Sequence, residues 1–215
     1  MDKQALEARE QMKSLSGREK LINFWYYYKV HIFAAIFVIV IVAFTAVECA
    51  RNIKYDLQIS YYSTVAIDTD GVTKLAENLQ EAVDDINLNG STDVQIAPCF
   101  ANLDEASEQT QAVYVKFTAE LAAGEAMGYI VDERFLEMFK KGYAESAEDI
   151  VEITDSPVIK KYLKLPEGQK LYWVTKTLYE KEKGKDESVA AHKNALKVEE
   201  YLKTGKLPEK AKKSE

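Results

Sequence analysis

One uninterrupted apolar run near the start of the chain restricts how the protein can fold. From Val30 to Val47 the sequence reads VHIFAAIFVIVIVAFTAV, and its only polar residues are His31 and Thr45. At about 1.5 Å per residue, a helix of this length spans about 27 Å, close to the thickness of the hydrocarbon core of a bilayer. Because 29% of the chain is charged, no part of it looks large and apolar enough to enclose such a helix. We therefore predict a single transmembrane helix over residues 30–47, which makes the lipid bilayer a partner of the chain.

The residues just before this run are typical of a membrane interface. Phe24 is followed by a series of aromatic and basic residues, Trp25, Tyr26, Tyr27, Tyr28 and Lys29. Aromatic rings with a polar edge favour the level of the lipid headgroups, and a lysine there can extend its ammonium group to the phosphates. We expect these five residues to lie at the membrane interface.

The distribution of basic residues predicts the orientation of the helix. Between residues 48 and 60 the only basic residues are Arg51 and Lys54. The tail before the run contains more of them, namely Lys3, Arg9, Lys13, Arg18, Lys20 and Lys29. The positive-inside bias therefore predicts that residues 1–29 are cytoplasmic and that residues 48–215 lie outside the plasma membrane. The tail is expected to be helical from about residue 16, where Ser16-Gly17-Arg18-Glu19 fits a capping box.

A cleaved signal sequence and a lipid-modified cysteine are alternatives for the same residues. The apolar run is longer than the usual signal core of about 7–15 residues, and no small-x-small cleavage site follows it. A lipoprotein signal ends in a cysteine that follows small residues, but Glu48 stands directly before Cys49. We expect the anchor to remain attached.

Residues 52–205 alternate between strand and helix patterns and predict one extracytoplasmic α/β domain. The expected strands cover residues 55–61, 94–97, 127–131, 150–153 and 171–177, with Pro98 ending the second. The expected helices cover residues 72–88, 103–123, 133–141 and 188–203, with a short helix starting at Pro157. This alternation implies right-handed crossovers, so the predicted fold class is α/β, with a single small mostly parallel sheet and helices on both faces. The charged tail, residues 206–215, is expected to be disordered.

Part of this domain resembles a known family. In the stretch Gln111–Phe139, a helix ends in Glu120-Leu121-Ala122-Ala123-Gly124 and a strand ends in Tyr129-Ile130-Val131-Asp132. The next helix has the large apolar residue Phe135 near its start. These features are similar to a segment of the type 2 extracellular solute-binding proteins, and the similarity covers roughly residues 55–155.

The resemblance implies one lobe of a fold that normally closes two lobes around a solute. The outer region has room for one lobe only, so transport by enclosing a solute is not expected. The whole arrangement, a short basic tail with W-Y-Y-Y-K, one helix and one such lobe, also resembles uncharacterised single-pass membrane proteins of Gram-positive bacteria. That similarity implies no activity.

One edge of the predicted sheet is the expected place for a ligand. Open α/β sheets bind ligands beyond the carboxyl ends of their strands, where the loops 61–71, 98–104 and 132–134 are expected to meet. The expected lining residues are Tyr61, Tyr62, Phe100 and Asp132. In an equally supported alternative, Asp132 caps the helix that follows it.

Groups for acid–base, nucleophilic or metal chemistry are sparse. His31 is expected at the membrane edge and His192 on a polar helix face, and neither belongs to a recognisable serine or cysteine arrangement. The segment Asp68-Thr69-Asp70-Gly71 begins like a calcium loop, but the glycine comes too early and Leu79 occupies the place of the last carboxylate. A polar turn with a helix cap is favoured instead. We therefore expect no catalytic residue, no metal site and no cofactor.

The two cysteines are not expected to pair. Cys49 lies near the start of the first predicted strand, and Cys99 follows the end of a parallel strand. These places are separated by a strand length of about 17 Å, which is too far for a disulfide. We expect two free or buried thiols.

Two functional hypotheses from different classes are left open. In the first, the protein is a membrane-anchored binding or interaction module for a small extracellular ligand or another membrane protein. This hypothesis predicts a contiguous exposed patch of apolar or aromatic residues. In the second, it is an accessory subunit whose membrane helix makes the useful contacts through small residues, namely Ala34, Ala35, Ala43 and Ala46. The first is favoured, and the excess of 31 acidic over 22 basic residues outside the cytoplasmic tail disfavours nucleic acid as a partner.

Overall fold

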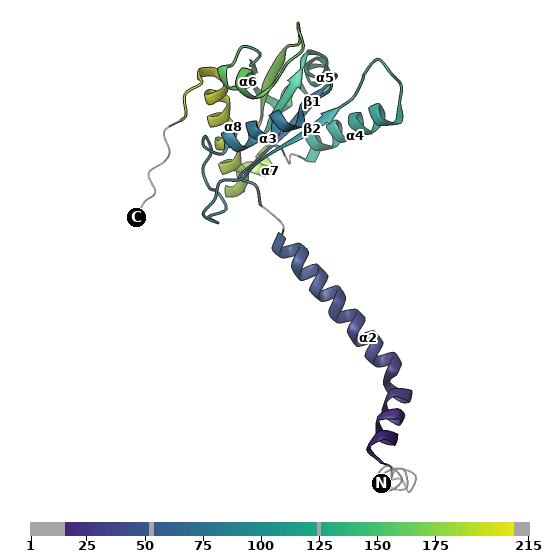
Figure 1. The fold of residues 1–215 in the computed structure, drawn as a ribbon. Coiled ribbons are helices and arrows are strands. Elements are labelled where there is room, and N and C mark those ends of the chain that lie inside the picture. The colour runs from purple at the N-terminus through teal and green to yellow at the C-terminus, as the bar shows by residue number, and fades with distance from the viewer. Residues whose placement is uncertain (1–15, 52–53, 124–125, 209–215) are drawn as a thin grey trace, which may run out of the picture. The chain divides into compact units, whose positions relative to one another are not determined.

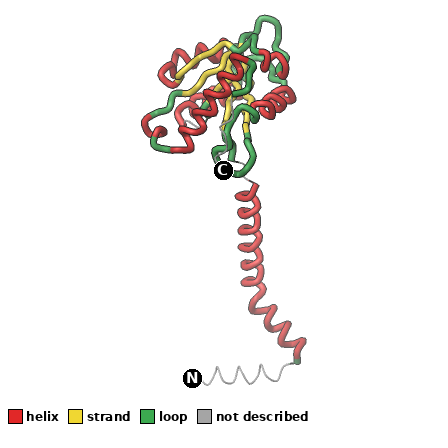
Figure 2. Tube along the Cα trace, turned by 90° about the vertical axis from the view of Figure 1, so that its left-hand side faces the viewer, coloured by secondary structure: helices red, strands yellow, loops and turns green. Residues whose placement is uncertain are grey.

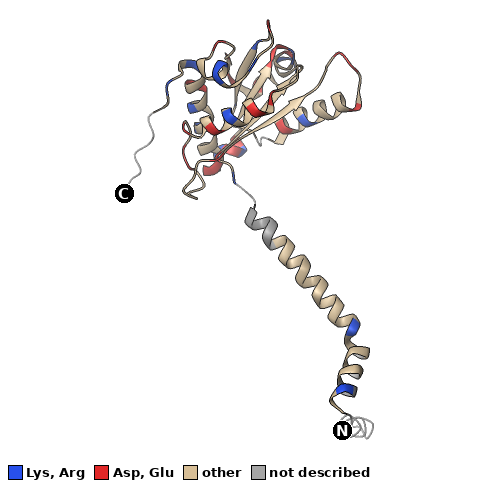
Figure 3. Cartoon of the chain, viewed as in Figure 1, with Lys and Arg blue, Asp and Glu red and all other residues tan. Residues whose placement is uncertain are grey.

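The computed structural model describes residues 16–51, 54–123 and 126–208, and the chain divides into two units, Met1–Ile53 and Lys54–Glu215. The first unit contains the helix α2 (Gly17–Arg51), which begins where the sequence predicted. Its window Tyr28–Thr45 has a mean hydropathy of 2.2 and is not buried within the protein. Figure 3 shows that the described charges of α2 lie toward its beginning. The helix is long and apolar enough to cross a bilayer. A secretory signal sequence near the N-terminus meets the same criterion.

The polar and aromatic residues of α2 are accommodated by the helix itself. The hydroxyl of Thr45 donates to the carbonyl oxygens of Ile41 and Val42 at 3.0 Å each, so it needs no partner from outside. Near the start, the Phe24 and Tyr28 rings stack with centroids 4.8 Å apart. The side chains of Trp25, Tyr26, Tyr28 and Lys29 are exposed, while that of Tyr27 lies outside the described residues. Their place at a membrane interface stays a prediction.

The described part of the second unit forms one five-stranded sheet (Figures 1 and 2). Its strands are β1 (Leu57–Ser63), β2 (Val94–Phe100), β3 (Gly128–Asp132), β4 (Ala147–Glu152) and β5 (Leu171–Lys176), in the spatial order β2-β1-β3-β5-β4. The five predicted strands are confirmed. However, only β1 with β2 and β1 with β3 pair in parallel, whereas β5 is antiparallel to both β3 and β4. The sheet is therefore mixed rather than mostly parallel.

The chain reverses direction between β4 and β5. Helix α6 (Pro157–Tyr162) has only 6 residues, and Pro157 stands in its first turn as predicted. Such a helix rises about 9 Å, less than the roughly 20 Å length of a strand of this kind. The chain does not cross back along the sheet, and β5 starts beside the end of β4, where the carbonyl oxygen of Leu171 accepts a hydrogen bond from the amide of Ile153.

The helices lie on both faces of the sheet, as predicted. One face is covered by α3 (Thr69–Leu79), α6 and α8 (Asp186–Thr204), and the other by α4 (Glu108–Ala123) and α5 (Glu133–Tyr143). Alternation along β1 serves both cores, because Ile59 and Tyr61 pack toward α3 while Tyr62 packs toward α4. Two short elements were not predicted, the 3₁₀ helix η1 (Ala144–Ser146) and α7 (Glu180–Lys183).

The loop after α3 departs most from the predicted helices. The sequence predicted a helix to residue 88, but α3 ends at Leu79. The buried carboxylate of Asp56 accepts hydrogen bonds from the amides of Ile86, Asn87 and Asp93, which holds this segment in a loop. These bonds compete with helical ones, so the apolar spacing alone does not continue the helix.

Three local predictions about strand and helix ends have definite outcomes. Asp68 caps α3 by accepting from the amide of Gly71 at 3.2 Å, as the favoured alternative predicted. The last helix, predicted over residues 188–203, is α8, and it ends at Thr204, followed by Gly205 with a left-handed φ of 69°. The prediction that Pro98 ends the second strand is wrong, because β2 continues to Phe100. As β2 is an edge strand, it tolerates a residue without an amide hydrogen.

Candidate functional site

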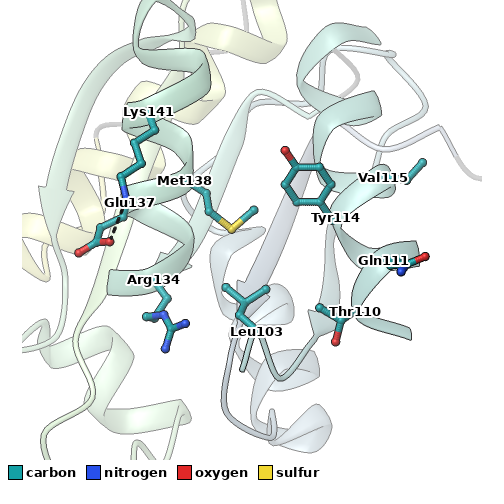
Figure 4. Close-up of a pocket in the computed structure, with 9 residues that line it drawn as sticks. All are labelled: Leu103, Thr110, Gln111, Tyr114, Val115, Arg134, Glu137, Met138 and Lys141. Carbon is teal, nitrogen blue, oxygen red and sulfur yellow. Dashed lines mark ion pairs between the residues drawn. The ribbon is translucent and has the colours of Figure 1, made fainter. Parts of the chain in front are cut away.

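A groove with a volume of about 580 Å³ lies between α4 and α5 on the outside of the domain (Figure 4). It is lined by Leu103, Thr110, Gln111, Tyr114, Val115, Arg134, Glu137, Met138 and Lys141. In Figure 4, Met138 on α5 and Tyr114 on α4 point toward each other, with Leu103 below them. The groove is thus a hollow between two helices with an apolar centre.

The groove exists because α4 packs on the sheet through few of its side chains. Phe117 and Leu121 are the buried residues of α4, and Phe117 contacts Phe135 of α5 with ring centroids 5.7 Å apart. The other face of α4 is exposed, with Tyr114 at 53% and Val115 at 62% of their full accessible surface. An aromatic and a branched apolar side chain of this exposure, next to a hollow, indicate a contact surface.

The α5 side of the groove is charged. The guanidinium group of Arg134 donates to both carboxylate oxygens of Asp104, at 2.9 and 3.3 Å. This hydrogen bonding, followed by the charge of Asp104, raises the pKa of Arg134. Nζ of Lys141 lies 3.7 Å from a carboxylate oxygen of Glu137 on the preceding turn. All four side chains are about half exposed or more, so water screens both pairs.

A partly buried polar cluster fixes α4 to the sheet beneath the groove. One carboxylate oxygen of Glu120 accepts from the hydroxyl of Ser60 at 2.8 Å and from that of Tyr62 at 2.7 Å. Burial, then the hydrogen bond to Glu120, raises the pKa of Tyr62. The ammonium group of Lys116 lies 3.0 Å from Sγ of Cys99, and this contact raises the pKa of Lys116. The cluster holds α4 in place from below.

The four residues predicted to line a ligand site lie at the same end of neighbouring strands but have different surroundings. Tyr61 and Tyr62 are buried in the cores on opposite faces of the sheet. Phe100 is partly exposed, at 37%. These four residues are not part of the lining of the α4–α5 groove. That they line a ligand site of their own stays a prediction.

Both oxygens of Asp132 already have partners within the domain. One accepts from the amide of Phe135 at 3.0 Å and thereby caps α5, as the alternative reading predicted. The other accepts from the amide and the hydroxyl of Thr64, at 2.5 and 2.6 Å. Asp132 therefore joins the ends of β1 and β3, and this structural role needs no ligand.

The prediction that His192 lies on a polar helix face is wrong. His192 is buried on α8, and its Nε2 lies 2.8 Å from a carboxylate oxygen of Glu148. The sequence of the helix did not predict the burial of His192, because its partner Glu148 belongs to β4, which is far away in the sequence. Among the described residues, no group of three or more His, Cys, Asp and Glu side chains is arranged to hold a metal ion. Cys99 is a free, buried thiol, and the side chain of Cys49 lies outside the described residues.

The α4–α5 groove was not predicted from the sequence. The signal for it was the adjacent aromatic and branched apolar pair Tyr114 and Val115 on α4, both of which are exposed. Comparison of the chain with protein-family models, with curated protein sequences and with solved structures finds no match. The resemblance to solute-binding proteins therefore stays a prediction.

Proposed function

We propose that this protein is a membrane-anchored interaction module, in which the α4–α5 groove of the outer domain binds another membrane protein. The observation that carries the proposal is the exposed apolar pair Tyr114 and Val115 on α4, next to a groove whose centre is lined by Leu103 and Met138. An aromatic and a branched apolar side chain exposed side by side next to a hollow favour a contact partner. A patch of this kind is also what distinguishes a binding module from a passive subunit.

The proposal places α2 across the plasma membrane, with the N-terminus in the cytoplasm and the domain outside. The length and hydropathy of Tyr28–Thr45 support a spanning helix, and the basic tail supports this orientation. Protease added to intact cells is then expected to remove the domain from α2. Complete protection of the domain in intact cells, with digestion after lysis, would contradict the orientation.

Binding without catalysis fits the chemistry of the groove. Its lining combines apolar, amide and hydroxyl groups with Arg134, Glu137 and Lys141, and these charges pair with one another or with Asp104. The lining includes no histidine or cysteine and thus no nucleophile–base pair of a familiar kind. The open hollow suits a protein surface better than an enclosed solute, and a single lobe cannot close around a solute as two lobes do.

The alternative function is that of an accessory subunit that acts through α2. It is favoured by one observation, the exposed alanines on the apolar helix, of which Ala34, Ala35 and Ala43 are described. In that case the outer domain is a remnant that binds nothing, and the groove makes no contact.

Photo-cross-linking in native membranes distinguishes the two functions. A photoreactive amino acid replaces Val115 in the groove, Lys193 on the exposed face of α8 as a control, or Ala35 in α2. The proposal predicts that position 115 captures one membrane protein, that position 193 does not, and that Tyr114→Asp abolishes the capture. Capture at position 35 alone would overturn the proposal in favour of the accessory subunit.

A further inference from the structure

The two walls of the α4–α5 groove differ in character. The α4 wall is uncharged and contributes Thr110, Gln111, Tyr114 and Val115. The α5 wall is charged, and apolar Leu103 and Met138 lie in the centre. An occupant that matches both walls has an apolar stripe next to a charged stripe, which is the character of an amphipathic helix.

The charges on the α5 wall have a defined order. Arg134, Glu137 and Lys141 are three and four residues apart, so they lie on one face of the helix with the signs plus, minus, plus. At 1.5 Å per residue they occupy about 10 Å of the wall, or two turns. This series sets a register that a second helix can match charge by charge.

The internal partners of these residues do not prevent such a match. The side chains of Arg134 and Asp104 are 49% and 73% exposed, and those of Lys141 and Glu137 are 79% and 62% exposed. Exposed ion pairs contribute little to stability, so their members can share or exchange partners when a ligand binds. Each of the three charges therefore stays available to an incoming group.

Building on the function proposed above, we infer that the groove binds an amphipathic helix of the partner protein, antiparallel to α5, with an acidic, a basic and an acidic residue at positions i, i+4 and i+7. In this arrangement the acidic residues lie against Lys141 and Arg134, and the basic residue lies against Glu137. The antiparallel direction also pairs the helix dipoles favourably. Apolar residues at i+1, i+5 and i+8 then pack on Tyr114 and Met138.

Two synthetic helical peptides test the inference against the full-length protein in detergent micelles. The matched peptide contains the series Glu-Leu-Ala-Gln-Lys-Leu-Ala-Glu-Leu, and the reversed peptide exchanges every Glu and Lys of that series. Fluorescence anisotropy is expected to show about three- to tenfold tighter binding of the matched peptide, since three exposed pairs each contribute a small part. The net charge of −7 on the protein favours the basic peptide, so unspecific attraction predicts the opposite preference.

A charge-reversed protein provides the matched control. The variant R134E/E137K/K141E carries the signs minus, plus, minus on the same exposed face, and it is expected to prefer the reversed peptide by a similar factor. Tyr114→Ala is expected to weaken both complexes, because it removes the apolar contact and leaves the charges unchanged. Circular dichroism confirms that each variant is folded.

The possible results separate this inference from the function it rests on. Equal binding of both peptides, or a preference that the charge-reversed variant does not invert, overturns the charge register. No binding of either peptide up to about 1 mM overturns the helical occupant. In both cases, capture of a membrane protein at position 115 would still support the proposed function as an interaction module. If nothing is captured at position 115, the proposed function is overturned as well.

Discussion

The two faces of the sheet are covered in different ways. On one face, α8 is bound to the sheet and to α3 by many buried or half-buried polar contacts. The side chain of Asn194 accepts from the amide of Asp84, in the loop after α3, and donates to the carbonyl oxygens of Asp84 and Asp56. The hydroxyl of Thr175 on β5 donates to the carboxylate of Glu199 on α8. On the other face, α4 rests on Phe117, Leu121 and the Glu120 cluster, and its outer side chains are exposed.

This difference shows which part of the domain is available for binding. A helix fixed along its whole length and polar on its outside, as α8 is, maintains the fold. A helix fixed from below and with Tyr114 and Val115 exposed beside a groove, as α4 is, maintains the fold with one face and offers the other to a partner. Substitutions on α4 should therefore affect stability or binding according to the face they change.

The largest predicted effect is on the inner face of α4. Phe117→Ala removes a fully buried ring that contacts Tyr62, Phe135 and Phe139. We expect a loss of about 3–5 kcal/mol in the free energy of unfolding, measured by denaturant titration of the full chain. A loss below about 1 kcal/mol would show that α4 is not packed as described.

A smaller loss is expected at the polar link beneath α8. Asn194→Ala deletes a buried amide and leaves the amide of Asp84 and two carbonyl groups without their partner. We expect a cost of about 2–3 kcal/mol in the same titration. The exposed residue Glu200 on the same helix is the matched control, and Glu200→Ala should change stability by less than about 0.5 kcal/mol.

Alkaline pH should weaken both faces through neighbouring tyrosines. Burial, then the charge of Asp132, raises the pKa of Tyr61 to about 12, and the pKa of Tyr62 is raised as well. A raised pKa in the folded state contributes stability that is complete below pH 10 and is lost as pH rises toward the folded value. We expect unfolding to become easier between about pH 10 and 12, by about 1–2 kcal/mol for Tyr61.

The variant Tyr61→Phe isolates this contribution. It has no group to ionise, so its stability should fall less steeply above pH 10 than that of the natural chain. The measurement is the free energy of unfolding at several pH values between 8 and 12. Identical pH profiles for the two chains would mean that Tyr61 ionises as easily in the folded state as in the unfolded one.

The smallest effect on stability is expected on the outer face of α4. Tyr114→Ala removes a half-exposed ring whose loss should change the free energy of unfolding by less than about 0.5 kcal/mol. Cross-linking of a partner at position 115 should nevertheless decrease strongly. A large loss of stability would assign Tyr114 to the fold rather than to the contact surface.

The sequence predicted the strands better than it predicted their directions. Strand positions follow from local alternation, which is why β1 and β3 lie within two or three residues of their predicted limits. The direction of β5 depends on the edge of the sheet to which the chain returns after residues 153–170, which local periodicity does not contain. Likewise, the loop after α3 is set by Asp56, whose partners lie about 30 residues away.

The candidate site was less predictable than the fold. Ligand binding at strand ends is a general rule of open α/β sheets, and it directed attention to Tyr61, Tyr62, Phe100 and Asp132. The structure gives Asp132 a capping role that the sequence had left open beside ligand binding. The α4–α5 groove depends on how two helices are spaced on the sheet, so the apolar residues Tyr114 and Val115 were visible in the sequence but the hollow beside them was not.

The central claim is that a partner covers the outer face of α4 in the native membrane, and thiol labelling tests it most directly. Single cysteines replace Val115 on α4 or Lys193 on α8, and a maleimide labels each variant in intact membranes and after purification, with the natural chain as background. We predict that position 115 is labelled several times more slowly in membranes than after purification, while position 193 is labelled equally in both. Equal labelling of position 115 in both preparations would contradict the claim.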